Sequence, residues 1–384
     1  VTPGFPSPEA PGRMRFTLEQ ALALEEKGAR VAVLDTAALA PTPKGLDSFE
    51  NLELLRLRHP GSATLHPWEF SRSVFQGLRR LSRSWSGRRF DGALFSFADH
   101  KHLSVLPWVH RRAAKVGVLA HGVDVMPGPM GVRQIGTELL LKQADLLFAV
   151  SRFTASLASH WVDKPVRLAV NGVRLEKLAE AKRMGASAAR VRLGWEGPTL
   201  LSVANLVPRK GLDLVLEALA KLAQRGLEFR HHIVGRGPER ARLQRQARHL
   251  RLEDRVDFED AQLSDAELAL RYAACDVFVL LSRSMEQPPG VEGFGLVYAE
   301  AQAVGRPVVG GRSGGVPEVV KDGETGFLIN PERPDAVEQL ANRLAELLVD
   351  PSLRARMGQA GRAWVESQFT WSRHAEQILA GFET

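Results

Sequence analysis

The sequence has one cysteine, Cys275, among 384 residues, and no apolar run near the ~20 residues that cross a bilayer. A single cysteine excludes a disulfide framework, which fits a reducing compartment. Hydrophobic residues make up 44% and charged residues 25% of the chain, the profile of a globular protein. The single cysteine and the lack of a long apolar run favour a cytoplasmic protein. The length of the chain allows two domains, each with its own core.

The common nucleotide-binding signatures are also missing. No GxxxxGK[ST] loop occurs, which argues against an ATPase. The stretch "GRGPER" at Gly235 has two of the three glycines of a dinucleotide fingerprint and then Arg240, so a hydride-transfer cofactor is poorly supported. No Asp-x-Asp pair is present to hold a metal against a diphosphate. We therefore expect neither a cofactor nor a metal.

Strand-like and helix-like segments alternate along the N-terminal half of the chain, and the alternation starts again in the C-terminal half. This pattern predicts two doubly wound parallel-sheet domains. Phe16–Lys27 has the pattern of an amphipathic helix, and Val31–Leu34 that of an apolar strand. The charged stretch Leu175–Gly197 is expected to be a linker with a lead-in helix. The opening "VTPGFPSPEAPG" is loop-like where such a domain normally has its first strand, so the chain is expected to start within that strand.

One stretch, "EGFGLVYAE", predicts a ligand site. Glu292 and Glu300 bracket a Gly-Phe-Gly turn that leads into a helix. The first backbone N–H groups of that helix, at Phe294, Gly295 and Leu296, together with the helix dipole, suit a diphosphate. Glu300, in the second turn, is placed to accept the hydroxyls of a ribose. Glu292, before the helix, is expected on the side where a sugar would lie.

A second stretch, "VANLVPRKGLD", is expected to supply positive charge. Arg209 and Lys210 follow a predicted strand and precede a predicted helix, where fixed cations neutralise a leaving diphosphate. By itself an Arg-Lys pair in a loop is usually only solvated.

The chain resembles the retaining glycosyltransferases of family 4, which have the GT-B architecture of two facing Rossmann-like domains with a cleft between them. The matching pieces are "LLSVANLVPRKG", "IVGRGPE", "YAACDVFVLLS", "EGFGLVYAEAQAVGRPVV", "SGGVPE" and "DGETGFL", in the family's order. More loosely, "HGVD" and "AVSRFTASLA…NGVR" match in the N-terminal half. The loop before the helix is most similar to GDP-mannose-dependent phosphatidylinositol-mannoside mannosyltransferases.

The resemblance implies domain limits and roles. Residues 1–174 would form the acceptor-side domain, residues 175–367 the nucleotide-sugar domain, and a C-terminal helix at about 368–384 would pack back on the first. Transfer would move a hexose from a nucleotide sugar, GDP-mannose being favoured over a UDP-hexose, to a glycan or lipid-linked acceptor with retention. The site residues so implied are Lys210 and Arg209 for the diphosphate, Glu300 for the ribose, Glu292 for the sugar hydroxyls and His121 near the transferred sugar.

Two departures from the family pattern concern the donor site. Asn205 stands where the family usually has an arginine five residues before the lysine, so one diphosphate cation is missing unless Arg209 or another arginine replaces it. The N-terminal loop has Pro11-Gly12 in place of a Gly-Gly pair; Gly12 still allows close backbone approach, but Pro11 removes one N–H donor. Both put donor affinity, rather than the fold, in question.

Positive charge is concentrated between His66 and Lys115, where ten Lys or Arg residues stand against three acids. Arg72, Arg79, Arg80 and Arg83 lie on an expected amphipathic helix in this basic 66–115 region. The region is either a solvated face or a contact with anionic lipid at the inner face of a membrane; nucleic acid is disfavoured because no binding module is present. Two rival functions remain open at this point: another GT-B enzyme such as a UDP-sugar epimerase, or an inactive binding relative.

Overall fold

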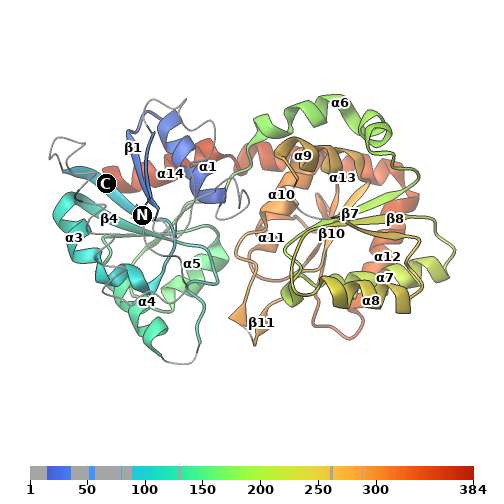
Figure 1. Cartoon of the computed structure of the whole chain (residues 1–384), viewed down its shortest axis with the longest axis horizontal. Helices are drawn as coiled ribbons and strands as arrows, with labels where there is room; N and C mark the ends of the chain where they lie inside the picture. Colours follow the sequence, from blue (N-terminus) through green and yellow to red (C-terminus); the bar gives the residue numbers. More distant parts are fainter. Residues whose placement is uncertain are drawn as a thin grey trace. The chain divides into compact units, whose positions relative to one another are not determined.

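The computed structural model describes residues 15–35, 52–56, 79, 89–128, 131–259, 263–287 and 289–384. The chain folds as two compact units (Figure 1). Unit 1 reaches to Gly172 and also takes in Trp371–Thr384, and unit 2 is Val173–Thr370.

Unit 1 is an α/β layer structure with parallel strands. Its elements are α1 (Arg15–Glu26), β1 (Val31–Asp35), β2 (Leu52–Arg56), β3 (Phe90–Phe95), the 3-10 helix η2 (His100–Ser104), α3 (Leu106–Arg112), β4 (Ala113–Ala120), α4 (Val132–Gln143), β5 (Leu146–Ala149), α5 (Arg152–Ser159), β6 (Val166–Leu168) and α14 (Trp371–Glu383). The described strands form two parallel sheets, β1-β2 and β3-β4-β5-β6. β4, "AAKVGVLA", is almost wholly buried, as expected for a parallel strand covered on both faces.

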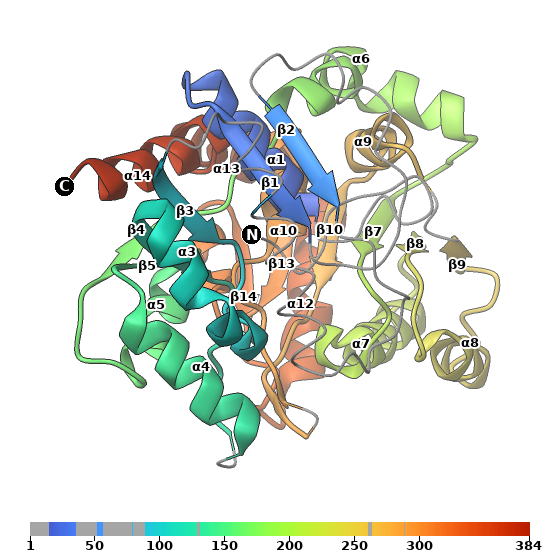
Figure 2. The same ribbon diagram turned by 60° about the vertical axis from the view of Figure 1, so that its left-hand side comes forward.

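The last helix of the chain belongs to unit 1. α14 packs beside α1, and the two lie on the same face of the sheet (Figure 2). Phe382 covers Gly92 of β3 so closely that a Cβ at that glycine would be 2.6 Å from the ring. The small residue therefore lets the end of α14 lie directly on the strand.

Unit 2 contains the following elements. They are α6 (Leu175–Leu193), β7 (Thr199–Val203), the 3-10 helix η3 (Pro208–Lys210), α7 (Leu212–Gln224), β8 (Arg230–Val234), α8 (Arg240–His249), β9 (Val256–Glu259), α9 (Asp265–Ala274), β10 (Val277–Leu280), β11 (Met285–Glu286), β12 (Pro289–Gly290), α10 (Leu296–Ala303), β13 (Val308–Gly311), α11 (Val316–Val319), β14 (Gly326–Ile329), α12 (Ala336–Val349) and α13 (Pro351–Gln368).

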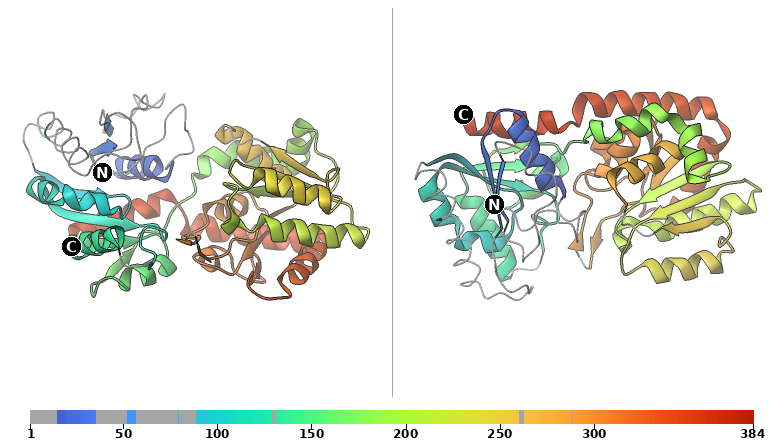
Figure 3. Two further views of the ribbon diagram at one scale, coloured as in Figure 1. Left: turned by 60° about the horizontal axis from the view of Figure 1, so that its bottom comes forward. Right: turned by 45° about the horizontal axis from the view of Figure 1, so that its top comes forward.

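The sheet of unit 2 has the strand order β14-β13-β10-β7-β8-β9, and its strands are parallel. Helices lie on both of its faces (Figures 1 and 3). The chain starts at β7, proceeds outward through β8 and β9, and then returns to β10 on the other side of β7. The order therefore reverses between β7 and β10, and ligands of doubly wound sheets bind at the carboxyl ends of the strands at such a point.

The predicted segments of unit 2 are found close to the expected positions. The lead-in helix is α6, interrupted at Gly185, whose φ is 76°. α9 starts with a capping box, in which the Ser264 hydroxyl accepts from the Glu267 N–H and the Glu267 carboxylate accepts from the Ser264 N–H. Such local signals explain why the element order could be predicted from the sequence.

Candidate functional site

Two cations and one carboxylate meet beyond the carboxyl ends of β7 and β10. Lys210 Nζ lies 2.5 Å from Glu292 Oε2, and Arg209 Nη1 lies 3.0 Å from the same oxygen. Lys210 is buried, with 7% of its surface exposed. The structure therefore joins three predicted site residues, of which Glu292 is more than eighty positions from the other two.

The backbone around this trio is fixed by neighbouring loops. Arg209 and Lys210 form η3, and Gly211 follows in the left-handed region with φ 64°. The N–H of Arg283 donates to the carbonyl of Arg209 at 2.8 Å, and the N–H of Gly315 donates to the carbonyl of Glu292 at 2.8 Å. The loops after β7, β10 and β13 are thus tied to one another where the charges converge.

The electrostatics keep Glu292 ionised. Burial alone would raise the pKa of Glu292, but the charges of Lys210 and Arg209 and their hydrogen bonds outweigh it and lower this pKa below its usual value. Burial lowers the pKa of Lys210, against the attraction of Glu292. One carboxylate faces two cations, so the trio carries a net positive charge, which suits a phosphate group.

The helix predicted after the Gly-Phe-Gly turn is present as α10. Gly295 is its N-cap, with φ 96°, and no side chain caps this terminus. The first N–H groups of a helix have no partner within it, and they can bind an anion. Leu296 is the first helical residue, whereas the Phe294 side chain is buried and packs edge-on against Phe369, so Phe294 can offer only its backbone.

Glu300 lies in the second turn of α10, as expected. Tyr272 of α9 donates its hydroxyl to Glu300 Oε2 at 2.8 Å. This contact orients one carboxylate oxygen and was not anticipated from the sequence. The sequence gives no signal for this contact other than the rarity of tyrosine, of which the chain has two residues.

The other tyrosine, Tyr298, also supports this site. Its hydroxyl donates to the carbonyl of Leu280, the last residue of β10, at 2.6 Å, and lies 3.1 Å from Ser282 Oγ. Burial raises the pKa of Tyr298, so its proton is retained. The hydrogen bond fixes the first turn of α10 to the end of the strand beside the site.

His121 belongs to unit 1 and follows β4. Its ring is in contact with the rings of Phe16, at 4.1 Å between centroids, and Phe97, at 5.8 Å. Within the described residues its Nε2 has no hydrogen-bond partner. Burial, together with the neighbouring His374, lowers the pKa of His121 to about 3. The ring is therefore neutral near pH 7, able to share a hydrogen bond with a ligand but not to act as a cationic acid.

Asp124 fixes the loop that carries His121. Its carboxylate accepts the N–H of His121 at 2.9 Å and the N–H of Ala98 at 3.0 Å. Burial raises the pKa of Asp124, although these backbone N–H groups oppose the rise. The "HGVD" match pointed to this loop, but the positioning contact itself required the structure.

Some predicted features cannot be located. Pro11 and Gly12 lie outside the described residues. Of the basic 66–115 region, the structure describes only Arg79, which is exposed, and residues 89–115. Asn205 is exposed in the loop after β7. The described part of the chain has no cluster of His, Cys, Asp or Glu placed to hold a metal, and no described helix is long and apolar enough to span a bilayer.

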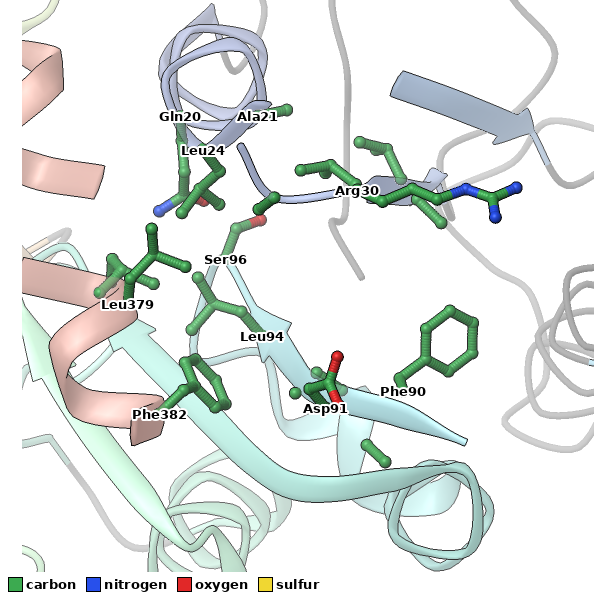
Figure 4. Close-up of a pocket in the computed structure, with 18 of the residues that line it drawn as sticks. Gln20, Ala21, Leu24, Arg30, Phe90, Asp91, Leu94, Ser96, Leu379 and Phe382 are labelled. Atoms are coloured by element: carbon green, nitrogen blue, oxygen red, sulfur yellow. The ribbon is translucent and has the colours of Figure 1, made fainter. Parts of the chain in front are cut away.

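Unit 1 contains a cavity of about 440 Å³ that is separate from these residues (Figure 4). Its walls are β1 and β3, with α1 and α14 also lining it. Figure 4 shows Leu94, Leu379 and Phe382 around it, so the lining is largely apolar. None of the described site candidates lines this cavity.

Comparison with known proteins identifies the family. Residues 188–364 match the family described as glycosyl transferases group 1. The chain is 34% identical over 281 residues, 72% of each chain, to the GDP-mannose-dependent alpha-(1-6)-phosphatidylinositol monomannoside mannosyltransferase of Mycolicibacterium smegmatis. The chain belongs to the group 1 glycosyltransferases. A Corynebacterium glutamicum relative, the GDP-mannose-dependent monoacylated alpha-(1-6)-phosphatidylinositol monomannoside mannosyltransferase, is 34% identical over 69% of each chain.

Solved structures agree on the fold of this group 1 glycosyltransferase. A sucrose-phosphate synthase from Thermosynechococcus elongatus matches with a TM-score of 0.79 and 23% identity, covering 99% of this chain and 96% of its own. The Anabaena protein HepE, solved with UDP and glucose, matches with a TM-score of 0.74 and 21% identity over 95% of each chain.

The predicted family, the α/β GT-B fold and the enzyme class are therefore confirmed. This glycosyltransferase is a hexosyltransferase that uses a nucleotide sugar and a glycan or lipid-linked acceptor. Both of these relatives are named as transferases rather than epimerases.

Proposed function

We propose that this glycosyltransferase moves mannose from GDP-mannose to a lipid-linked acceptor of the phosphatidylinositol-mannoside class, with retention of configuration. The observation that carries the proposal is the similarity over 72% of the chain to an enzyme named for that donor and acceptor. The site in unit 2 supports it, because its positive trio and its helix N-terminus suit a nucleoside diphosphate.

We assign the residue roles as part of this proposal. Lys210 and Arg209 would bind the donor diphosphate, Arg209 replacing the cation that Asn205 does not supply. The backbone N–H groups of Phe294, Gly295 and Leu296 would share its charge, and Gly12 keeps the diphosphate-binding role that the sequence predicts.

The sugar-binding roles fall to three further side chains. Glu300, oriented by Tyr272, would accept the ribose hydroxyls. Glu292 would hold the mannose hydroxyls while keeping Lys210 in place, and neutral His121 would hydrogen-bond the same sugar from unit 1. Two fixed cations and a helix dipole can stabilise the charge that develops on the leaving GDP, so no metal is assigned a role.

The chemistry needs no protein nucleophile under this proposal. The C1–phosphate bond breaks as the acceptor oxygen bonds to C1 on the same face, and the departing phosphate takes the acceptor's proton. A lipid acceptor would also bring the protein to a membrane surface, at its inner face, and that localisation is part of the proposal.

The test is transfer by the purified protein with GDP-mannose, UDP-glucose or UDP-galactose as donor and phosphatidylinositol mannoside in detergent as acceptor. We expect a mannosylated lipid by mass spectrometry, an α-anomer by NMR, and the same rate in excess EDTA. Transfer from a UDP-hexose alone would contradict the donor assignment. Activity that EDTA abolishes and Mg²⁺ or Mn²⁺ restores would contradict the electrostatic account of the leaving group.

A further inference from the structure

The loops after β7 and β8 lie against each other at the carboxyl edge of the sheet in unit 2. β8 is next to β7 in this sheet, and the N–H of Leu206 donates to the carbonyl of Arg236 at 2.7 Å. A Cβ at Gly235 would overlap the carbonyl oxygen of Ala204, so the two loops touch along their backbones. The N–H of Leu206 belongs to the peptide group that joins it to Asn205. Asn205 and Arg236 are therefore neighbours across the two loops.

The backbone that carries Arg236 is held on both sides. Nη1 of Arg240 donates to the carbonyls of Gly235 at 3.2 Å and Glu259 at 3.3 Å. Nη2 of the same arginine donates to the carbonyl of Phe258 at 2.8 Å. These bonds join the loop after β8 to the end of β9, while the contacts with the β7 loop hold its other side. Arg236 itself is exposed, so the loop presents a cation from a fixed position beside Asn205.

The charge that the trio and α10 offer a diphosphate is incomplete. Lys210 and Arg209 share the carboxylate of Glu292, which cancels half of their positive charge. The N-terminus of α10 adds the equivalent of about half a positive charge. The diphosphate of a nucleotide sugar carries about two negative charges, one on each phosphate. Part of that charge is therefore unmatched, and Asn205 supplies none.

Two other arginines on the described loops at this edge lie beside acids. Arg283, after β10, is 2.9 Å from Asp213. Arg312, after β13, pairs with Asp322. Both ion pairs connect parts of unit 2 to one another, which gives these two arginines a structural role. Arg236 is the arginine whose carbonyl is bonded to the residue after Asn205, at the position where the missing cation would stand.

We propose that Arg236 binds the diphosphate of the donor and makes up for the arginine that Asn205 replaces. Its guanidinium would present two parallel N–H groups to phosphate oxygens, a geometry that a lysine cannot offer. Arg209 supplies part of the missing charge, because it is shared with Glu292, and Arg236 supplies the rest. The inference rests on the proposed function, since it adds a residue to the same donor site.

The test is calorimetric titration of the wild type and its variants with GDP and with UDP. Arg236→Gln should weaken the binding of both nucleotides about tenfold, because both carry the same diphosphate. Combining Arg236→Gln with Asn205→Arg should bring both affinities back to within about threefold of the wild type, since a cation returns to the neighbouring loop. The matched control is Arg245→Gln, which removes another exposed arginine nine positions further on, in α8, and should stay within about twofold of the wild type.

The outcomes separate a diphosphate contact from other roles of Arg236. A single variant that binds both nucleotides as the wild type does would overturn the inference. A loss confined to GDP would also overturn it, because Arg236 would then contact the base. So would a double variant that binds no better than the single one. Arg236→Lys should keep part of the affinity, and all variants should keep the thermal unfolding midpoint of the wild type.

The proposed function can fail separately from this inference. Wild-type protein that binds GDP and loses affinity on Arg236→Gln, yet transfers no mannose, would contradict the proposed function alone. Unchanged GDP binding by Arg236→Gln in an enzyme that does transfer mannose would contradict the role of Arg236 alone.

Discussion

Both tyrosines of the chain act through their hydroxyl groups at or beside α10. Tyr298 fixes the helix to the end of β10, and Tyr272 orients the carboxylate of Glu300. Neither hydroxyl faces a proposed reacting bond, so their contribution is to hold other groups in position. The ribose role of Glu300 is therefore testable by separating its charge from its orientation.

We predict that Glu300→Ala weakens GDP binding by roughly 1–3 kcal/mol, because ribose hydroxyls would lose their acceptor. Tyr272→Phe should cost less, about 0.5–1.5 kcal/mol, since it removes only the orienting bond. Calorimetric titration with GDP and with 2′-deoxy-GDP measures both effects. Wild-type protein should prefer GDP and Glu300→Ala should not; an unchanged preference in the variant would contradict the ribose assignment.

At the scale of elements, the junction between η3 and α7 controls where the two cations lie. Gly211 has φ 64°, and a Cβ there would be 2.0 Å from the carbonyl oxygen of Leu281. The loop after β10 therefore packs directly on this glycine, one residue after Lys210.

We expect Gly211→Ala to destabilise unit 2 by roughly 2–5 kcal/mol, from the left-handed backbone and the clash together, and to weaken GDP binding. Gly226→Ala is the control: it has φ 75° but open space around it, so it should cost only about 1–2 kcal/mol and leave GDP binding intact. Thermal unfolding and GDP titration give the two readouts. Equal effects of both substitutions would show that the clash does not matter.

Elements with local signals could be predicted from the sequence, and contacts between distant elements could not. The sequence predicts β7, α7 and α10 from their apolar runs and glycines, and it predicts Lys210, Glu292 and Glu300 as residues of one ligand site. The meeting of Glu292 with two cations depends on how three loops close over the sheet.

At the scale of the whole molecule, the described histidines whose pKa is lowered by burial are unevenly divided between the units. Burial lowers the pKa of His102 and His374 to about 4 and that of His121 to about 3 in unit 1, whereas in unit 2 it lowers the pKa of His231 to about 3. Unfolded imidazoles bind protons near pH 6.5, so the unfolded state takes up more protons than the folded one below that pH. Stability is then complete above about pH 6.5 and is lost progressively as pH falls toward the folded values.

We predict that lowering the pH from 7.5 to 5 destabilises unit 1 more than unit 2. Amide hydrogen exchange, followed by mass spectrometry, should accelerate in β4 and β5 before it does in β7 and β10. Raising the pH from 7.5 to 8.5 should change neither unit through these histidines. Earlier opening of unit 2 in acid would be inconsistent with this account.

The chain path has a consequence for synthesis. Unit 2 begins at Val173 and ends at Thr370, and these residues are bridged, with the N–H of Val173 donating to the carbonyl of Phe369 at 2.8 Å. Unit 1 needs α14, which the ribosome makes after all of unit 2. At about 5–20 residues per second, roughly 10–40 seconds pass between Gly172 and Trp371. During that time Phe148 and Gly92 lack their cover from the end of α14. Unit 2 can therefore finish folding before unit 1, and a nascent chain would expose this part of the sheet to chaperones until α14 has left the ribosome.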